Sequence, residues 1–217
     1  MGMHEEVLQA AKDMLRVGLT AGTSGNISGR IDDRTIVITP SSVDYEAMTL
    51  EDLVVLDLDG NVVEGTRHAS SEKALHLECY KRYDEVRSVI HTHPVYATMF
   101  AYARIPIPAV IDEFAIYVGG DVPCAEYAAS GTNDLGVNAA GCVESVGTAL
   151  LASHGMVTVG PNPAKTLHQA GVVERSAQIV WGARALGGAH DLPAEVNKNF
   201  GGLYRYVRAN PPDQAGR

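Results

Sequence analysis

The sequence has few residues of several kinds, and each shortage excludes a class of protein. Only three of its 217 residues are cysteines, too few and too irregularly spaced for a disulfide framework, which favours reduced thiols in a cytoplasmic protein. No uncharged apolar run is long enough to span a bilayer. The polar stretch 1–6 is unlike a secretory signal. We therefore expect no membrane partner.

Basic residues are also scarce. The chain has 17 lysines and arginines against 26 acidic residues, a formal net charge of -9, which argues against nucleic-acid binding. A small anionic substrate is still permitted, because a few local hydrogen-bond donors can hold a phosphate. Hydrophobic residues make up 46% of the chain and charged residues 20%, as in ordinary globular proteins. With no long linker, residues 1–217 are expected to form one domain.

The hydrophobic pattern alternates between helical and strand periods. It predicts helices at 4–19, 70–83, 95–102, 133–145, 163–186 and 194–206, and strands at 27–30, 35–39, 53–58, 61–63, 88–93, 148–152 and 156–159. Residues 105–121 are rich in proline and glycine and receive no assignment. An Asp-Gly pair at 59–60 is a strong hairpin signal. The order of elements therefore favours an α/β sandwich with a substantially antiparallel sheet.

Four residues could form a metal site. His91 and His93 end an apolar strand, and the period of two places both imidazoles on one side of the sheet. His154 follows a second apolar strand, and Glu72 stands at the start of a helix. Three imidazoles and a carboxylate are typical zinc ligands. The alternative is that the His-x-His pair is an ordinary core or surface pair.

Three short polar segments, 22–26, 39–42 and 70–71, could form a phosphate cradle. Hydroxyls, an Asn amide and exposed backbone N–H groups bind phosphate oxygens, and a helix start adds further donors. Because the third segment directly precedes Glu72, a phosphate held there would lie close to the metal. The alternative for each segment alone is turn and cap chemistry. The candidate residues are Asn26, Ser41, Ser42, Ser70 and Ser71, with Thr23 as a further candidate.

Together these pieces resemble the class II aldolase and adducin head family, closest to its L-fuculose-1-phosphate aldolase branch. The matching segments run in family order. They are Gly22-Thr23-Ser24-Gly25-Asn26-Ile27-Ser28, Ile38-Thr39-Pro40-Ser41, Ser70-Ser71-Glu72, His91-Thr92-His93-Pro94, Ile107-Pro108-Ala109, Gly119-Gly120-Asp121-Val122-Pro123-Cys124, Tyr127-Ala128 through Gly131-Thr132, and His154-Gly155.

The resemblance implies a three-layer α/β/α sandwich around a mostly antiparallel sheet, assembled as a homotetramer with sites between subunits. It implies zinc, or another divalent cation, held by Glu72, His91, His93 and His154, and a phosphorylated sugar held by the phosphate residues named above. The expected reaction is that of a lyase. It cleaves L-fuculose 1-phosphate, or a similar deoxyketose 1-phosphate, to dihydroxyacetone phosphate and an aldehyde such as L-lactaldehyde. Glu72 is expected to act as a base once it leaves the metal.

One position departs from the aldolase pattern. After the Ile-Pro-Ala segment the aldolases carry a catalytic tyrosine from a neighbouring subunit, and by counting Asp112 takes its place here. Tyr117 follows five residues later, and Tyr206, with Tyr204 as the second match, could supply the family's C-terminal tyrosine. A pentulose-phosphate 4-epimerase, which uses the same retro-aldol step, and a sugar-phosphate dehydratase or decarboxylase are the alternative enzymes. A structural adducin-like module is disfavoured because all four ligands are present.

Overall fold

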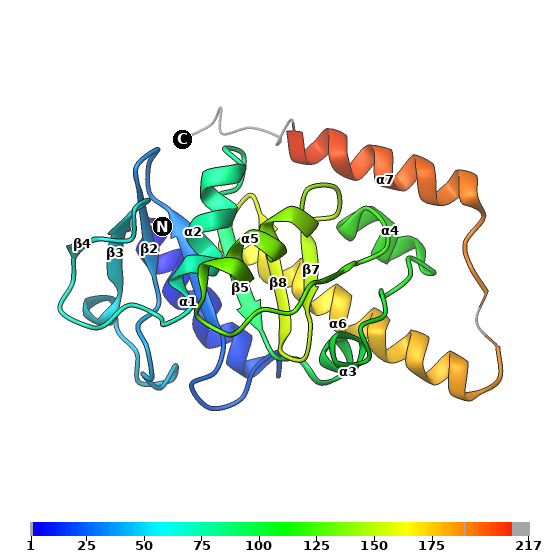
Figure 1. The fold of residues 1–217 in the computed structure, drawn as a ribbon, viewed down its shortest axis with the longest axis horizontal. Helices are drawn as coiled ribbons and strands as arrows, with labels where there is room; N and C mark the ends of the chain where they lie inside the picture. The colour runs from blue at the N-terminus through cyan, green and yellow to red at the C-terminus, as the bar shows by residue number, and fades with distance from the viewer. Residues whose placement is uncertain (1, 189, 210–217) are drawn as a thin grey trace.

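The computed structural model describes residues 2–188 and 190–209, which are built around one eight-stranded sheet (Figure 1). The strands are β1 (Asn26–Arg30), β2 (Thr35–Ile38), β3 (Val54–Asp57), β4 (Val62–Glu64), β5 (Ser88–Thr92), β6 (Cys124–Ala125), β7 (Thr148–Leu151) and β8 (Gly155–Gly160). Their order is β4-β3-β2-β1-β5-β8-β7-β6. Neighbours are antiparallel except for β6 and β7, so the expected mostly antiparallel sheet is confirmed.

Helices cover both faces of the sheet (Figure 1). They are α1 (Met3–Arg16), α2 (Lys73–Arg82), α3 (Val95–Ala103), α4 (Asp112–Val118), α5 (Asn133–Cys142), α6 (Pro163–Ala185) and α7 (Ala194–Ala209), with a short 3-10 helix at Leu50–Asp52. The first face packs against α1, α3, α4 and α6, and the second against α2 and α5. This arrangement is the predicted three-layer α/β/α sandwich. None of the described helices has the length and apolar character needed to cross a bilayer.

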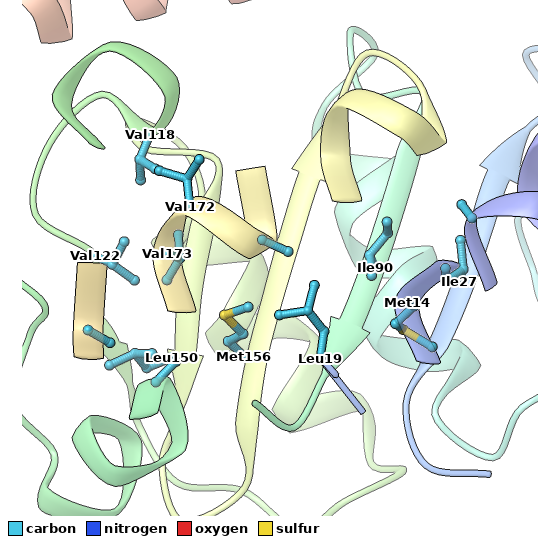
Figure 2. Packing of buried hydrophobic residues seen from close by; sticks show 14 of the residues in the cluster. Met14, Leu19, Ile27, Ile90, Val118, Val122, Leu150, Met156, Val172 and Val173 are labelled. Carbon is cyan, nitrogen blue, oxygen red and sulfur yellow. The ribbon is translucent and has the colours of Figure 1, made fainter. Parts of the chain in front are cut away.

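Two hydrophobic cores result from the alternation of side chains along the strands. In β5, Val89 faces α2 and α5, whereas the next residue, Ile90, faces α1 and α6. Figure 2 shows the core on the side of α1 and α6, in which Ile90 lies among Met14 of α1, Ile27 of β1 and Met156 of β8. Strands buried on both faces read as continuous apolar runs, which is why the sequence predicts them well.

Residues 105–125 contain the elements that the sequence did not predict, α4 and β6. The segment is held by tertiary contacts: Ile107 bridges Val122, and the Ala109 N–H donates to Asp121 Oδ1 at 2.8 Å. Helix α4 has only seven residues and ends at Gly119, whose φ of 92° requires glycine. Such a short helix carries too little periodicity to be read from sequence. The three cysteines are free thiols, as expected.

Strand register sets the position of the functional residues. Asn26, the first residue of β1, pairs with His91 near the end of β5, and His91 also pairs with Val157 of β8. The start of β1, the end of β5 and the start of β8 therefore meet at one edge of the sheet. The loop that leads into α2 reaches the same edge, because Ser70 N–H donates to the Thr39 carbonyl just after β2.

Candidate metal centre

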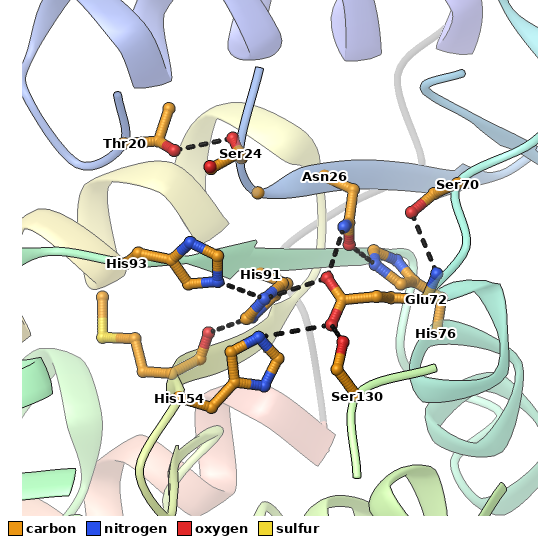
Figure 3. A network of polar contacts seen from close by, with 12 residues as sticks. Thr20, Ser24, Asn26, Ser70, Glu72, His76, His91, His93, Ser130 and His154 are labelled. Atoms are coloured by element: carbon orange, nitrogen blue, oxygen red, sulfur yellow. Dashed lines mark hydrogen bonds and ion pairs between the residues drawn. The ribbon is translucent and has the colours of Figure 1, made fainter. Parts of the chain in front are cut away.

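Three histidines and one glutamate converge at this edge. One possible ligand atom from each of Glu72, His91, His93 and His154 lies within 4.8 Å of the others. Glu72 Oε2 is 3.1 Å from His91 Nε2, and Glu72 Oε1 is 3.3 Å from His154 Nε2. His93 Nε2 lies 2.8 Å from His91 Nε2 (Figure 3). The cluster can hold one metal ion.

Hydrogen bonds outside the cluster fix the ligand atoms. The Nδ1 of His91 lies 2.9 Å from the Met156 carbonyl oxygen, which can only accept, so Nδ1 carries a proton and Nε2 is the nitrogen that could bind a metal ion. His91 is fully buried, and Glu72 is nearly so. The orientation of the ring is therefore set before any ion binds.

The carboxylate of Glu72 is held at both oxygens. The Asn26 amide donates to Oε2 at 3.0 Å, and the Ser130 hydroxyl donates to Oε1 at 2.7 Å. The backbone N–H of Glu72 donates to Ser70 Oγ at 3.2 Å, which anchors the residue as the N-cap of α2. Figure 3 shows these contacts surrounding Glu72. A carboxylate with this many donors keeps one orientation.

The protonation states suit a divalent cation. Burial raises the pKa of Glu72, but the hydrogen bond and charge of His91 and the hydrogen bonds from Ser130 and Asn26 outweigh it and hold the pKa below its usual range. Burial and the neighbouring His91 and His154 lower the pKa of His93 to about 4. The same causes, burial and then His91, lower the pKa of His154. Glu72 is therefore a carboxylate, and His93 and His154 are neutral imidazoles, at neutral pH, which is the state that metal binding requires.

Two glycines let backbone approach the cluster closely. A Cβ on Gly25 would lie 2.8 Å from the His91 carbonyl oxygen, and one on Gly155 would overlap the Thr92 carbonyl oxygen and lie 2.6 Å from His93 Cδ2. Contacts this short are not tolerated, so both positions need glycine. The glycines in the Gly-Asn and His-Gly pairs therefore have a steric role at this edge.

Two of the candidate phosphate residues lie on the 39–42 segment, which pairs with the segment that leads to Glu72. Ser41 N–H donates to the His68 carbonyl at 2.9 Å, which pairs the 39–42 segment with the segment leading to Ser70. Ser41, Ser42 and Ser71 are exposed, whereas Ser70 is buried. Three candidate hydroxyls are therefore exposed on the paired segments.

The loop 22–25 is fixed by its carbonyl groups. Thr20 Oγ1 donates to the Ser24 carbonyl at 2.6 Å, and Tyr45 OH donates to the Gly25 carbonyl at 2.6 Å. Thr23, in the same loop, is exposed. Asn26, which follows the loop, is buried and directed at Glu72 (Figure 3).

The remaining candidates, Asp112, Tyr117, Tyr204 and Tyr206, lie on α4 and α7. Asp112 is exposed at the first residue of α4, a helix that packs on α6 and α7. Tyr117 is 46% exposed and stacks edge-on with His168, and Tyr206 is 67% exposed on α7. Tyr204 instead is partly buried in α7, beside Gly119 and Gly147. In the described residues, the group of possible ligands around Glu72 does not include Asp112.

Two residues of the site were not predicted from sequence. Ser130 was read only as part of a motif, and His76 was not singled out at all. Ser130 could not be placed, because it reaches Glu72 from a loop 58 positions away. His76 had a signal that was available: it stands four residues after Glu72 on a predicted helix and so shares its face.

Comparisons with known proteins identify the relatives of this chain. The model of the family described as Class II Aldolase and Adducin N-terminal domain matches residues 5–181. L-ribulose-5-phosphate 4-epimerase UlaF of Salmonella paratyphi B is 37% identical over 212 residues, covering 91% of this chain and 93% of that protein.

Solved structures agree with this fold. A structure of L-fuculose 1-phosphate aldolase superposes with a TM-score of 0.89 at 36% identity, covering 94% of this chain and 96% of that one. The L-fuculose-1-phosphate aldolase of Thermus thermophilus gives a TM-score of 0.76 at 27% identity, covering 88% of this chain and 98% of that one.

The comparisons correct one expectation. The chain was expected to cleave L-fuculose 1-phosphate to dihydroxyacetone phosphate and L-lactaldehyde, and the similarity to a 4-epimerase along nearly the whole chain shows that this interpretation was wrong. The error has a physical reason. Both reactions break a carbon–carbon bond beside a ketone, so the same metal ligands serve both, and ligand motifs cannot distinguish them.

Proposed function

We propose a function from one premise: the chain belongs to the class II aldolase and adducin N-terminal domain family. It is an enzyme that inverts the configuration at C4 of a pentulose 5-phosphate, of the L-ribulose 5-phosphate type. The observation that carries this proposal is the 37% identity to a 4-epimerase over 93% of that protein's length. The acid at Asp112, where the aldolases carry a tyrosine, supports it independently.

The chemistry is a reversible aldol cleavage. A base removes the proton of the C4 hydroxyl, the C3–C4 bond breaks, and its electron pair stays with the C1–C3 fragment as an enediolate. C4 becomes an aldehyde. The aldehyde turns by half a rotation, C3 adds to its other face, and an acid returns a proton to the new C4 oxygen. No atom is gained or lost, and two proton-carrying groups are needed, one for each face.

A bound metal would stabilise the charge left by the broken bond. Glu72, His91, His93 and His154 would hold a divalent cation, which we propose to be zinc, and which would supply Lewis-acid stabilisation to the enediolate. The donor set supports this assignment, because three imidazoles and a carboxylate lie within 4.8 Å of one another. The Asn26 and Ser130 hydrogen bonds keep the carboxylate oriented throughout.

The phosphate segments explain why the aldehyde is retained. In a 5-phosphate the phosphate stays on the fragment that contains C4. We assign Asn26, Ser41, Ser42, Ser70 and Ser71, with Thr23, to this phosphate. A phosphate held by several donors keeps the aldehyde fragment bound while its C4 carbonyl turns, so it recombines before it can leave.

The proton-carrying groups come from a second copy of the chain. Asp112 is exposed on α4 and, among the residues described, lies outside the ligand group of its own chain. A homotetramer with sites between subunits would bring Asp112 of one copy to the metal centre of another. Tyr117 and Tyr206, also exposed, are the candidates for the second group.

The test is conversion of L-ribulose 5-phosphate to D-xylulose 5-phosphate by protein loaded with zinc, with chelator-treated protein as the control. Run in deuterium oxide, the reaction should give a product without deuterium on carbon, because the C4–H bond is never broken. Deuterium at C4 would contradict the retro-aldol step. Faster release of dihydroxyacetone phosphate from L-fuculose 1-phosphate would contradict the epimerase assignment itself.

A further inference from the structure

A row of buried polar side chains leads away from Glu72 between α2 and β1. Glu72, His76 and Tyr80 are spaced four apart, so they lie along one face of α2. Asn26, Ser28 and Arg30 are spaced two apart and point to one side of β1. The two rows face each other and are buried along their whole length.

Hydrogen bonds connect these residues in one continuous chain. Asn26 Nδ2 lies 3.0 Å from Glu72 Oε2, and Asn26 Oδ1 lies 2.5 Å from His76 Nε2. On the other side of the ring, His76 Nδ1 lies 2.7 Å from Ser28 Oγ, which lies 2.9 Å from Tyr80 OH. Figure 3 shows the end of this chain nearest the metal centre, with Asn26 between Glu72 and His76.

The direction of every proton follows from the carboxylate. Glu72 can only accept, so the amide nitrogen of Asn26 faces it and the amide oxygen faces His76. That oxygen also can only accept, so His76 Nε2 carries a proton. Burial, followed by the charge of His91, lowers the pKa of His76 to about 3, so the ring is neutral. Nδ1 therefore accepts from Ser28, and Ser28 in turn accepts from Tyr80.

The far end of the row is closed by Arg30. Its Nη2 donates to the Tyr80 carbonyl at 2.6 Å, and its Nε donates to the Val86 carbonyl at 3.1 Å. The guanidinium also lies 5.0 Å from the centre of the Tyr80 ring. A cation near the C-terminal end of α2 is favourable, and it holds Tyr80 in place. The row is thus anchored at both ends, by a carboxylate and by a guanidinium.

We propose that His76 is a positioning residue for the epimerase reaction. It fixes the amide of Asn26 in one orientation, so that the amide nitrogen donates to Glu72. Without the Nε2 proton the amide could turn over, which would place its oxygen against the carboxylate and remove the donor. Buried polar groups cost stability unless each has a hydrogen-bond partner. Here all of them have partners only when every donor in the chain points toward Glu72. The kinetic test of this proposal rests on the proposed function, because it measures epimerase turnover.

Two substitutions separate positioning from packing. The amide nitrogen of His76→Gln reaches the place of Nε2 and can still donate to Asn26, whereas the side chain of His76→Asn reaches only the place of Nδ1. We expect His76→Gln to keep kcat within a few-fold and His76→Asn to lose about tenfold or more, as for other residues that orient ligands. Equal losses in both variants would overturn the proposal. Thr158→Val, which removes a buried hydroxyl elsewhere in the sheet, controls for lost stability alone.

A spectroscopic measurement tests the same point without turnover. Histidine 15N NMR of the metal-free protein should show His76 as the neutral Nε2–H form between pH 5 and 8. Ser28→Ala should keep the Nε2–H form, because the Asn26 oxygen still accepts from Nε2, and this variant serves if His76→Asn does not fold. A wild-type Nδ1–H form would refute the proposal. If the wild-type protein fails to epimerise L-ribulose 5-phosphate, the proposed function fails, while the tautomer still decides the role of His76.

The metal centre gives a third readout. Cobalt(II) bound in place of zinc absorbs visible light according to the arrangement of its ligands. Because His76→Asn lets the amide of Asn26 release Glu72, we expect its cobalt spectrum to differ from that of the wild type, and that of His76→Gln to match it. Identical spectra for all three proteins would show that His76 does not affect how Glu72 binds the metal.

Discussion

The metal centre and the surface of α4 and α7 hold polar residues proposed for the same reaction, but the two regions are built differently. At the metal centre the ligand residues are held by strand register and by hydrogen bonds from buried neighbours. On α4 and α7, Asp112, Tyr117 and Tyr206 stand on exposed helix positions. One chain therefore holds all four candidate metal ligands, whereas the proton-carrying part of the proposed site would depend on a second chain.

This difference bears on how the family changes its chemistry. Ligand residues that are buried and mutually constrained cannot be exchanged without losing the metal. Exposed residues at the start of a short helix can change more freely, because fewer contacts in their own chain depend on them. We infer that the choice between aldolase and epimerase is made on the exposed side, at positions such as Asp112.

The largest effect should come from the buried region. In His93→Ala one of four ligands is lost, and we expect both bound metal and epimerase activity to fall to background, since even residues behind the ligands cost about 10–100-fold. Metal content by mass spectrometry and the rate with L-ribulose 5-phosphate check this. His190→Ala, at an exposed histidine, is the control. A metal-loaded, active His93→Ala protein would remove His93 from the ligand set.

On the exposed side, Asp112→Asn should lower kcat by about 100-fold or more, the usual contribution of a general acid or base. Metal content and KM should stay near wild-type values, because Asp112 belongs to neither the ligand group nor the phosphate segments of its own chain. Glu113→Gln is the matched control, since Glu113 is the neighbouring acid and pairs with Arg175 at 3.2 Å. Equal losses in the two variants would indicate a general effect of negative charge on α4.

Substitutions in the proposed phosphate segments should change substrate affinity more than turnover. Ser71→Ala removes one exposed hydroxyl, and a hydrogen bond to a charged phosphate contributes about 1.5 kcal/mol, so KM should rise about tenfold. We expect kcat to change less, because the phosphate is not at the reacting bond. Steady-state kinetics separate the two constants. A lower kcat with an unchanged KM would move Ser71 out of the phosphate site.

The smallest effect concerns the pH dependence of stability, to which histidines with lowered pKa values contribute. His93 and His76 have folded pKa values of about 4 and about 3, below the ordinary value of 6.5. As pH falls below 6.5 the unfolded chain takes up protons that the folded chain does not, so the stability of the metal-free protein falls until pH reaches about 4. Thermal unfolding should show a lower Tm at pH 5 than at pH 7, by about 2–4 °C for each kcal/mol lost.

The variant His76→Asn provides the control for this prediction. It lacks one of the two imidazoles whose pKa values are lowered to about 3 and about 4, so its Tm should depend less on pH between 7 and 5 than that of the wild type. An equal dependence in both proteins would mean that other groups cause the effect. Loading with zinc should also reduce the dependence, because bound metal excludes protons from His93.

Much of the fold could be predicted because its signals are local. Strands buried on both faces give continuous apolar runs, and α1 shows a clear helical period. The candidate metal ligands could be identified from sequence for the same reason: His91 and His93 share a strand end, and Glu72 stands at the start of a helix. Residues 105–121 could not be assigned, because tertiary contacts such as the hydrogen bond from Ala109 N–H to Asp121 hold them, and they show no regular hydrophobic period.

The sequence by itself determined the class of fold, the four candidate ligands and the shortage of basic residues, since each depends on residue type and short spacing. Only the tertiary structure decided that Ser130 and Asn26 hold Glu72, that His76 stands behind Asn26, and that Asp112 lies apart from the ligand group of its own chain. The contacts that hold Glu72 join residues 46 and 58 positions apart. Spacing within one element cannot encode them, because they arise from strand register and from the packing of α2 on β1.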